Sequence, residues 1–125
     1  MTTSQQARTA YAAATRPIRS PRGIEYDAFA AITARLRTAA GGDKTRFPAL
    51  AAALHDNRRL WTILAGDVAD AGNQLVQELR ARIFYLAEFT LQHTPKVLAG
   101  EASADILVQI NLAVMSGLRN ERAAA

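Results

Sequence analysis

The sequence predicts an all-α protein that folds as a single small bundle of about five helices. Alanine is abundant, whereas Gly and Pro number only 7 and 4 among 125 residues, which favours helix over sheet. Apolar residues recur at the 3.6-residue spacing of helices, and no alternating β-branched run indicates a strand. We expect residues 1–19 to form a basic, Ala-rich N-terminal helix or linker and residues 20–122 to form the bundle.

The first two helices fall in the basic part of the chain. Residues 4–15 have high helix propensity, but their apolar stripe is mostly alanine and is too thin to hold a helix without a docking partner. Ser20 and Pro21 are good start signals for a second helix, because the Ser hydroxyl accepts an orphan N–H and Pro suits the first helical position. This helix should run to about Ala40, where two glycines stop it.

The third helix should begin at Phe47–Pro48 and bury one apolar stripe. Asn57 or Arg58 interrupts the stripe at one turn, so the polar segment 56–59 either breaks the helix or serves a purpose. A left-handed cap in the turn that contains Gly72 should end the helix. The stripe consists of Phe47, Leu50, Leu54, Trp61, Leu64 and Val68.

The fourth helix should run from Gln74 to about Leu98, with a kink or a new start at Pro95. Two apolar stripes predict that it is buried on most sides. Gly100 should end it, and Ser103 can cap a last helix. The first stripe of the fourth helix consists of Leu75, Leu79, Ile83, Leu86 and Thr90, and the second consists of Phe84, Tyr85, Phe89 and Leu91. The stripe of the last helix consists of Ile106, Leu107, Ile110, Val114 and Leu118.

Enzyme chemistry is not visible in the sequence. Cysteine is absent, which excludes disulfides, thiolate metal sites and thiol nucleophiles. His55 and His93 have no metal-binding context, and His93 should instead bond the carbonyls that Pro95 leaves unpaired. No phosphate-binding glycine loop or nucleophile elbow occurs. We therefore expect no catalytic residues, no cofactor and no metal.

No segment is apolar enough to span a membrane, and no signal peptide is recognisable at the N-terminus. We therefore expect a cytoplasmic protein.

The net charge of +4 is unevenly distributed. Residues 1–46 carry eight Lys and Arg against three Asp and Glu, a balance of +5, and residues 47–125 carry seven against eight, a balance of −1. The basic part could steer the protein toward RNA or an acidic partner. We favour a solvated terminus, because no aromatic residues stand between Arg16, Arg19 and Arg22 as stacking platforms.

The segment around Trp61 supports two interpretations. The apolar stripe favours a core position for Trp61, whereas Arg59 beside it suggests a partner groove, because Trp, Tyr and Arg dominate interface hot spots. Asn57 and Arg58 either form a buried polar network or make exposed ion pairs worth under about 1 kcal/mol. The aromatic stripe of the fourth helix is a partner groove if no neighbour covers it. The candidate partner-binding residues are Arg58, Arg59, Trp61, Phe84, Tyr85 and Phe89.

Four segments resemble, in order, the FlaF family of flagellar biosynthesis proteins. The most specific part is NRRLW followed by GNQL. The segments are SPRGIEYDAFAAITARL (20–36), LHDNRRLWTILAGDVADAGNQL (54–75), LRARIFYLAEFTLQHTPKVL (79–98) and DILVQINLAVMSGL (105–118). The resemblance implies a cytoplasmic regulator of flagellated alphaproteobacteria that binds flagellin as a secretion chaperone. It also implies a functional link to FlbT, which acts on flagellin messenger RNA.

The residues that match the family are either its packing signature or its flagellin contacts. For Trp61 and Asn57 we favour packing, with Asn57 and Arg58 capping the turn 72–75. For Arg59 and the stripe of Phe84 and Tyr85 we favour binding. The matching residues are Pro21, Arg22, Glu25, Asn57, Arg58, Arg59, Leu60, Trp61, Gly72, Asn73, Gln74, Leu75, His93 and Asn111.

Two other functions stay open. The chain could be an RNA-binding regulator of the flagellin message, or an adaptor to another flagellar factor. The oligomeric state is also open. The basic residues that would contact RNA are Arg8, Arg16, Arg19, Arg22, Arg35 and Arg37.

Overall fold

Four α-helices and one short 3₁₀ helix make up the described part of the chain. A computed structural model describes the backbone of residues 26–124 and the side chains of residues 26–119. The all-α prediction is confirmed, while the predicted helix over residues 4–15 and the start signal at Ser20 and Pro21 lie outside the described residues. The elements are α2 (Tyr26–Ala40), η3 (Lys44–Arg46), α3 (Phe47–Ala69), α4 (Gln77–Leu98) and α5 (Asp105–Ala124).

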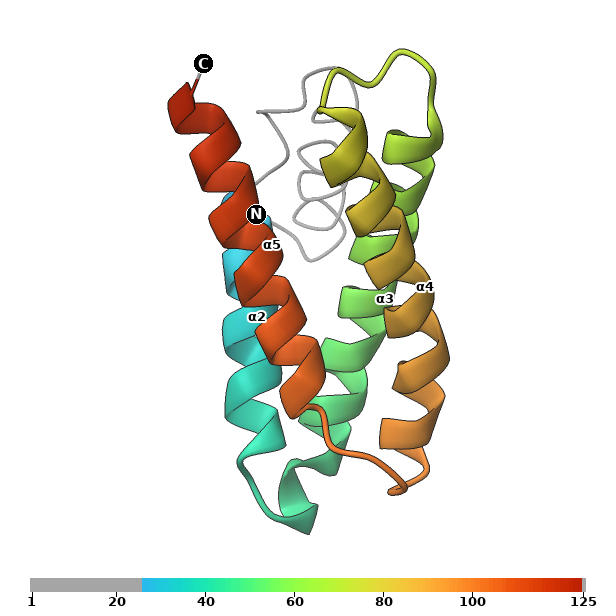
Figure 1. The fold of residues 1–125 in the computed structure, drawn as a ribbon. Helices are drawn as coiled ribbons and strands as arrows, with labels where there is room; N and C mark the ends of the chain where they lie inside the picture. The colour runs from blue at the N-terminus through green and yellow to red at the C-terminus, as the bar shows by residue number, and fades with distance from the viewer. Residues whose placement is uncertain (1–25, 125) are drawn as a thin grey trace, which may run out of the picture.

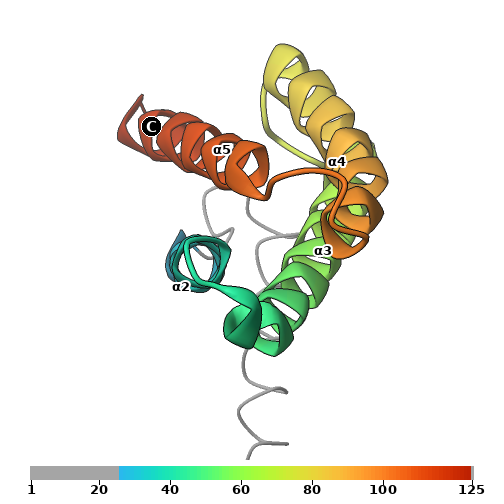
Figure 2. The same cartoon turned by 90° about the horizontal axis from the view of Figure 1, so that it is seen from below.

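The α-helices alternate in direction and form an up-down-up-down bundle (Figure 1). α2 packs against both α3 and α5, and α3 packs along α4, whereas α4 and α5 touch at few positions. Viewed from below, α5, α2, α3 and α4 follow one another in an arc (Figure 2). The apolar seam between α4 and α5 is therefore the least covered of the bundle.

The core consists of two apolar halves with a polar layer between them. One half is centred on Phe29 and Trp61, and the other on Leu36 and Leu54. Each α-helix contributes a buried polar side chain near the boundary between its residues of the two halves. These polar residues are Thr33 in α2, Asn57 in α3, Thr90 and Thr94 in α4, and Asn111 in α5.

The corner between α2 and α3 depends on a glycine and an acidic cap. A Cβ atom at Gly42 would collide with Cβ and Cγ of Arg46, so any other residue there would require the Arg46 side chain to move. Asp43 caps η3, because its Oδ1 accepts a hydrogen bond from the backbone N–H of Thr45 at 2.9 Å. α3 then begins at Phe47, as predicted.

The polar segment inside α3 does not break the helix, which continues to Ala69. The predicted left-handed cap at Gly72 is wrong, since the positive-φ glycine among the described residues is Gly100. Asp70 has an extended backbone instead, with φ −72° and ψ 131°. Its Oδ1 accepts the N–H of Gly72 at 3.0 Å, so an acidic side chain stabilises the turn without a left-handed residue.

Side chains also fasten the loop that follows α3. Asn73 Oδ1 accepts the N–H of Leu75 at 2.9 Å, and Leu75 is buried in the core. Arg80 donates from Nε to the carbonyl of Val68 at 3.0 Å and from Nη2 to that of Asp70 at 2.9 Å. The guanidinium thereby satisfies carbonyls that the end of α3 leaves without helical partners.

α4 begins at Gln77 rather than at the predicted Gln74, and it continues through Pro95 to Leu98 without a new start. Pro95 cannot donate the helical hydrogen bond to the carbonyl of Leu91, but it lies in the last turn, so little of the helix follows the lost bond. The prediction that α4 is buried on most sides is wrong. Its buried residues form one seam, which consists of Ile83, Ala87, Thr90, Thr94 and Val97.

The connection to α5 follows the prediction more closely. Gly100 has φ 77°, and Ser103 Oγ accepts the N–H of Asp105 at 3.0 Å. Leu107, Ile110, Val114 and Leu118 of the predicted stripe are buried, but Ile106 is exposed. Helical spacing places Ile106 on the side of α5 that faces α4, where the two helices make little contact.

Candidate functional site

Trp61 lies in the core, with 0% of its surface exposed. Its ring meets Phe29 edge-on, with centroids 5.8 Å apart and planes at 86°. Its Nε1–H donates to Oδ1 of Asn111 at 2.8 Å, as a buried indole requires. Trp61 therefore packs the core, and it is not on the surface where we had placed it among the candidate partner contacts.

Asn57 joins this network rather than capping the loop after α3. Asn111 Nδ2 donates to Oδ1 of Asn57 at 2.8 Å and to Oγ1 of Thr33 at 3.1 Å. One amide thus ties α2, α3 and α5 together at a single level. The predicted cap of the turn 72–75 by Asn57 and Arg58 is wrong, since Asn57 is buried at this layer and Arg58 is exposed.

Phe84 does not share a face with the other two candidate aromatic residues of α4, because successive residues in a helix are about 100° apart. Tyr85 and Phe89, four residues apart, lie on one face but differ in burial. Phe84 is 42% exposed and lines a hollow together with α3 residues. Tyr85 is 67% exposed. Phe89 packs against both halves of the core. The predicted stripe therefore divides into an exposed pair, Phe84 and Tyr85, and a half-buried residue.

Phe89 belongs to the α5 side of α4, where it stacks on His93 with centroids 5.2 Å apart and planes at 15°. His93 Nε2 lies 2.9 Å from the carbonyl oxygen of Ser103. His93 thus contacts the connection to α5, and the prediction that it bonds carbonyls freed by Pro95 is wrong.

A shallow, mostly apolar hollow of about 380 Å³ lies between α3 and α4 beside Phe84. Arg80 forms part of its wall, and the two carbonyl bonds of its guanidinium hold that wall in place. We call this hollow, together with Phe84 and Tyr85, the α3–α4 surface. The hollow is lined by Val68, Ala69, Gln77, Arg80, Ala81 and Phe84.

Arg58 and Arg59 are both exposed on the outer side of α3. Within the described residues the salt bridge joins Arg35 to Asp56 at 2.7 Å, so Asp56 pairs with α2 rather than with Arg59. Neither arginine is paired with a glutamate of α4 among the described residues. Arg58 lies on the same helical stripe as Ala69, so it flanks the α3–α4 surface.

The basic residues considered for RNA binding are only partly described. Arg35 is engaged by Asp56, and Arg37 is exposed near the end of α2. The others, Arg8, Arg16, Arg19 and Arg22, lie outside the described residues.

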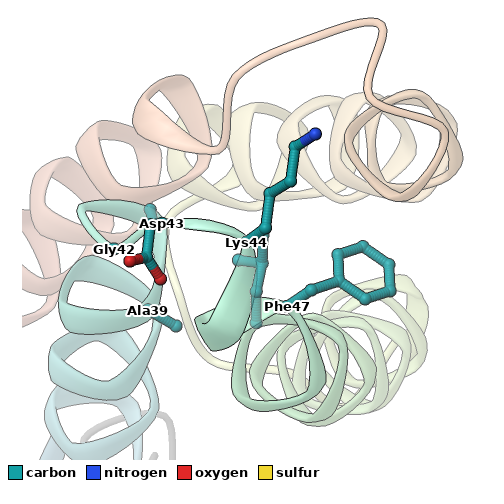
Figure 3. A pocket seen from close by; sticks show the side chains of 7 residues that line it. Ala39, Gly42, Asp43, Lys44 and Phe47 are labelled. Carbon is teal, nitrogen blue, oxygen red and sulfur yellow. The ribbon is translucent and has the colours of Figure 1, made fainter.

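A second open hollow, of about 570 Å³, lies at the α2–α3 corner (Figure 3). Phe47 projects outward there and is 48% exposed, so its predicted place in the core is wrong. In Figure 3 the carboxylate of Asp43 turns toward Ala39, whereas Lys44 extends away. Two hydrogen bonds from Thr45 hold the pKa of Asp43 below its usual value. This hollow lies about 32 Å along α3 from Val68.

Asp67 was not among the candidate site residues, although it falls one turn after Leu64 on the buried side of α3. Neither oxygen of its carboxylate has a hydrogen-bond partner among the described residues. Burial raises the pKa of Asp67, the approach of the Asn73 side chain partly offsets this, and the charge of Asp70 adds to the rise. A carboxylate near a helix C-terminus is also disfavoured by the dipole, so Asp67 is a source of pH-dependent stability.

A family model described as flagellar protein FlaF matches residues 7–118. No curated protein and no solved structure matches the chain. None of the helices in the described range is long and apolar enough to cross a membrane.

Proposed function

The chain belongs to the FlaF family of flagellar proteins, and from this membership we propose that it binds flagellin in the cytoplasm as a secretion chaperone. In this role it promotes the synthesis and export of flagellin and has no catalytic activity. A chaperone of this kind must offer apolar surface to its substrate without exposing its own core. The side chains that can bind flagellin are therefore large apolar side chains that lie outside the core.

The observation that carries the proposal is the exposure of two neighbouring aromatic residues of α4, Phe84 and Tyr85, of which Phe84 lines an apolar hollow. Large aromatic side chains beside a pocket are the usual anchors of helix-in-groove binding. Phe84 and Tyr85 are 42% and 67% exposed, whereas Trp61 and Phe29 are fully buried. The α3–α4 surface thus offers aromatic groups that the core does not need.

The test is calorimetric titration of flagellin monomer into the full chain at low and high salt. We expect micromolar or tighter binding that persists at high salt and has a negative heat-capacity change, because apolar burial drives it. The double variant Phe84→Ala/Tyr85→Ala should weaken binding at least tenfold. Phe47→Ala is the matched control, since Phe47 is also exposed beside a hollow but lies at the other end of α3.

Three results would redirect the proposal. Equal losses for the Phe84/Tyr85 and Phe47 variants would mean that the α3–α4 surface is not the flagellin site. No flagellin binding at either salt would contradict the chaperone function. Binding of the flagellin transcript with a steep salt dependence would favour the RNA-binding alternative, because phosphate neutralisation releases counterions.

A further inference from the structure

The outer face of α3 is a continuous exposed strip next to the α3–α4 surface. We define it by Arg58, Arg59, Thr62, Gly66 and Ala69, all of which are exposed. The buried side of α3 lies opposite and carries residues such as Trp61, Leu64 and Asp67. The strip has two arginines at one end and small side chains at the other.

Gly66 is not explained by packing within the described bundle. An added Cβ atom at Gly66 would meet nothing within 4 Å, and the residue lies in the last turn of α3, which ends at Ala69. Glycine in a helix is less favourable than alanine by up to about 1 kcal/mol, and no contact in the described bundle requires glycine here. An open glycine with small neighbours lets the backbone of another helix approach closely, as at tightly packed helix pairs.

The positive charges of Arg58 and Arg59 are not paired with an acidic side chain of α3. Asp56 is held by Arg35 at 2.7 Å, and Asp67 is buried on the other side of the helix. Glu88 of α4 is exposed on a neighbouring face but makes no ion pair with Arg58 or Arg59 among the described residues. The arginine end of the strip therefore complements carboxylates.

We propose that the outer face of α3 binds a helix that carries carboxylates about two turns away from a small residue. This inference rests on the proposed function, so the helix is a segment of flagellin. Its carboxylates pair with Arg58 and Arg59, and its small residue lies over Gly66, about 11 Å further along α3. An aliphatic side chain of the same helix enters the hollow beside Phe84.

The experiment measures flagellin affinity for the full chain carrying Gly66→Leu or the pair Arg58→Glu/Arg59→Glu. Leucine at Gly66 should preserve or improve folding, because it is a better helix former and has open space around it. It should nevertheless weaken flagellin binding at least tenfold by blocking the close approach. The arginine pair should lose at least tenfold, mostly at low salt, where ion pairs are least screened.

Two matched controls test whether any bulk or charge change would do the same. Ala34→Leu adds the same side chain on an exposed position of α2, and Arg37→Glu reverses an exposed charge at the end of α2. Both should stay within about threefold of the parent affinity. Circular dichroism and thermal melting of each variant verify that the bundle is intact.

The outcomes separate this inference from the proposed function. If the parent binds flagellin and the Gly66 and arginine variants bind like the controls, the outer face of α3 is not the contact and the chaperone function stands. If Gly66→Leu instead converts a dimer into a monomer in sedimentation, the face contacts a second copy and the inference fails. If the parent does not bind flagellin, the proposed function itself is contradicted.

Discussion

Replacing Asn111 by alanine should destabilise the bundle more than any surface change. The substitution removes the acceptor of the Trp61 N–H and the donor to Oδ1 of Asn57, which are bonds of 2.8 Å each. Thr33 keeps its bond to the carbonyl of Phe29. Two orphaned buried groups cost about 1–3 kcal/mol each, so we expect a loss of about 3–5 kcal/mol.

The measurement is urea unfolding followed by circular dichroism, combined with a double-mutant cycle. A loss of this size should lower the melting temperature by about 10–20 °C, given the entropy of unfolding of a domain this long. Trp61→Phe combined with Asn111→Ala should cost less than the sum of the two single changes, with a coupling of about 1–2 kcal/mol. Gln109→Ala on the exposed side of α5 is the control and should stay within about 0.5 kcal/mol.

The reasoning would be refuted by an Asn111→Ala loss under about 1 kcal/mol, or by strict additivity with Trp61→Phe. Either result would mean that the polar layer is not a connected network in solution.

Three further substitutions should change stability in directions that the structure fixes. Gly66→Ala should raise the free energy of unfolding by up to about 1 kcal/mol, because the site is open and lies within the last turn of α3; a loss would mean that something covers Gly66 in the free protein. Gly100→Ala should lower it by about 1–2 kcal/mol, because φ is 77° there; an unchanged midpoint in urea would contradict that backbone. The pKa of Asp67 is raised by folding, so the folded protein binds this proton more tightly than the unfolded chain does. The protonated carboxyl therefore contributes fully to folding stability below the unfolded pKa of 3.8, and this contribution is lost as pH rises through the folded pKa. Asp67→Asn should therefore stabilise the protein at pH 7 and do so progressively less as pH falls toward 3.8, and a pH-independent difference in melting temperature would count against this account.

Apolar periodicity was sufficient to predict α3 and most of its buried residues. The start at Phe47 and the burial of Leu54, Trp61 and Leu64 follow from one stripe, whatever helices cover it. The same stripe contains Asn57, but its partner Asn111 lies 54 residues away in the sequence. Asn57 and Asn111 can pair only if α3 and α5 become neighbours, and residue patterns do not show which helices do. From the sequence, a buried polar network was therefore only one of two alternatives.

The aromatic residues of α4 show a different limit. An apolar composition on several sides predicted a helix covered all round, yet α4 has extensive packing with α3 and little with α5. Periodicity identifies faces but not how many of them find a neighbour, which is why Phe84 and Tyr85 are exposed while Phe89, from the same predicted stripe, packs against the core. The turn after α3 failed for a local reason, since the side chain of Asp70 competed with a left-handed glycine.

The polar layer also sets an order of events during synthesis on the ribosome. Asn111 bonds to Thr33 and Trp61, which precede it by 78 and 50 residues, and α5 is made after the other described helices. Until α5 is made, Nε1 of Trp61 and Oδ1 of Asn57 lack the partner that Asn111 gives them, so α2, α3 and α4 can pair early but their shared polar layer stays open. A chain interrupted before Asn111 would present this layer, and the core side chains that α5 covers, to quality-control proteases.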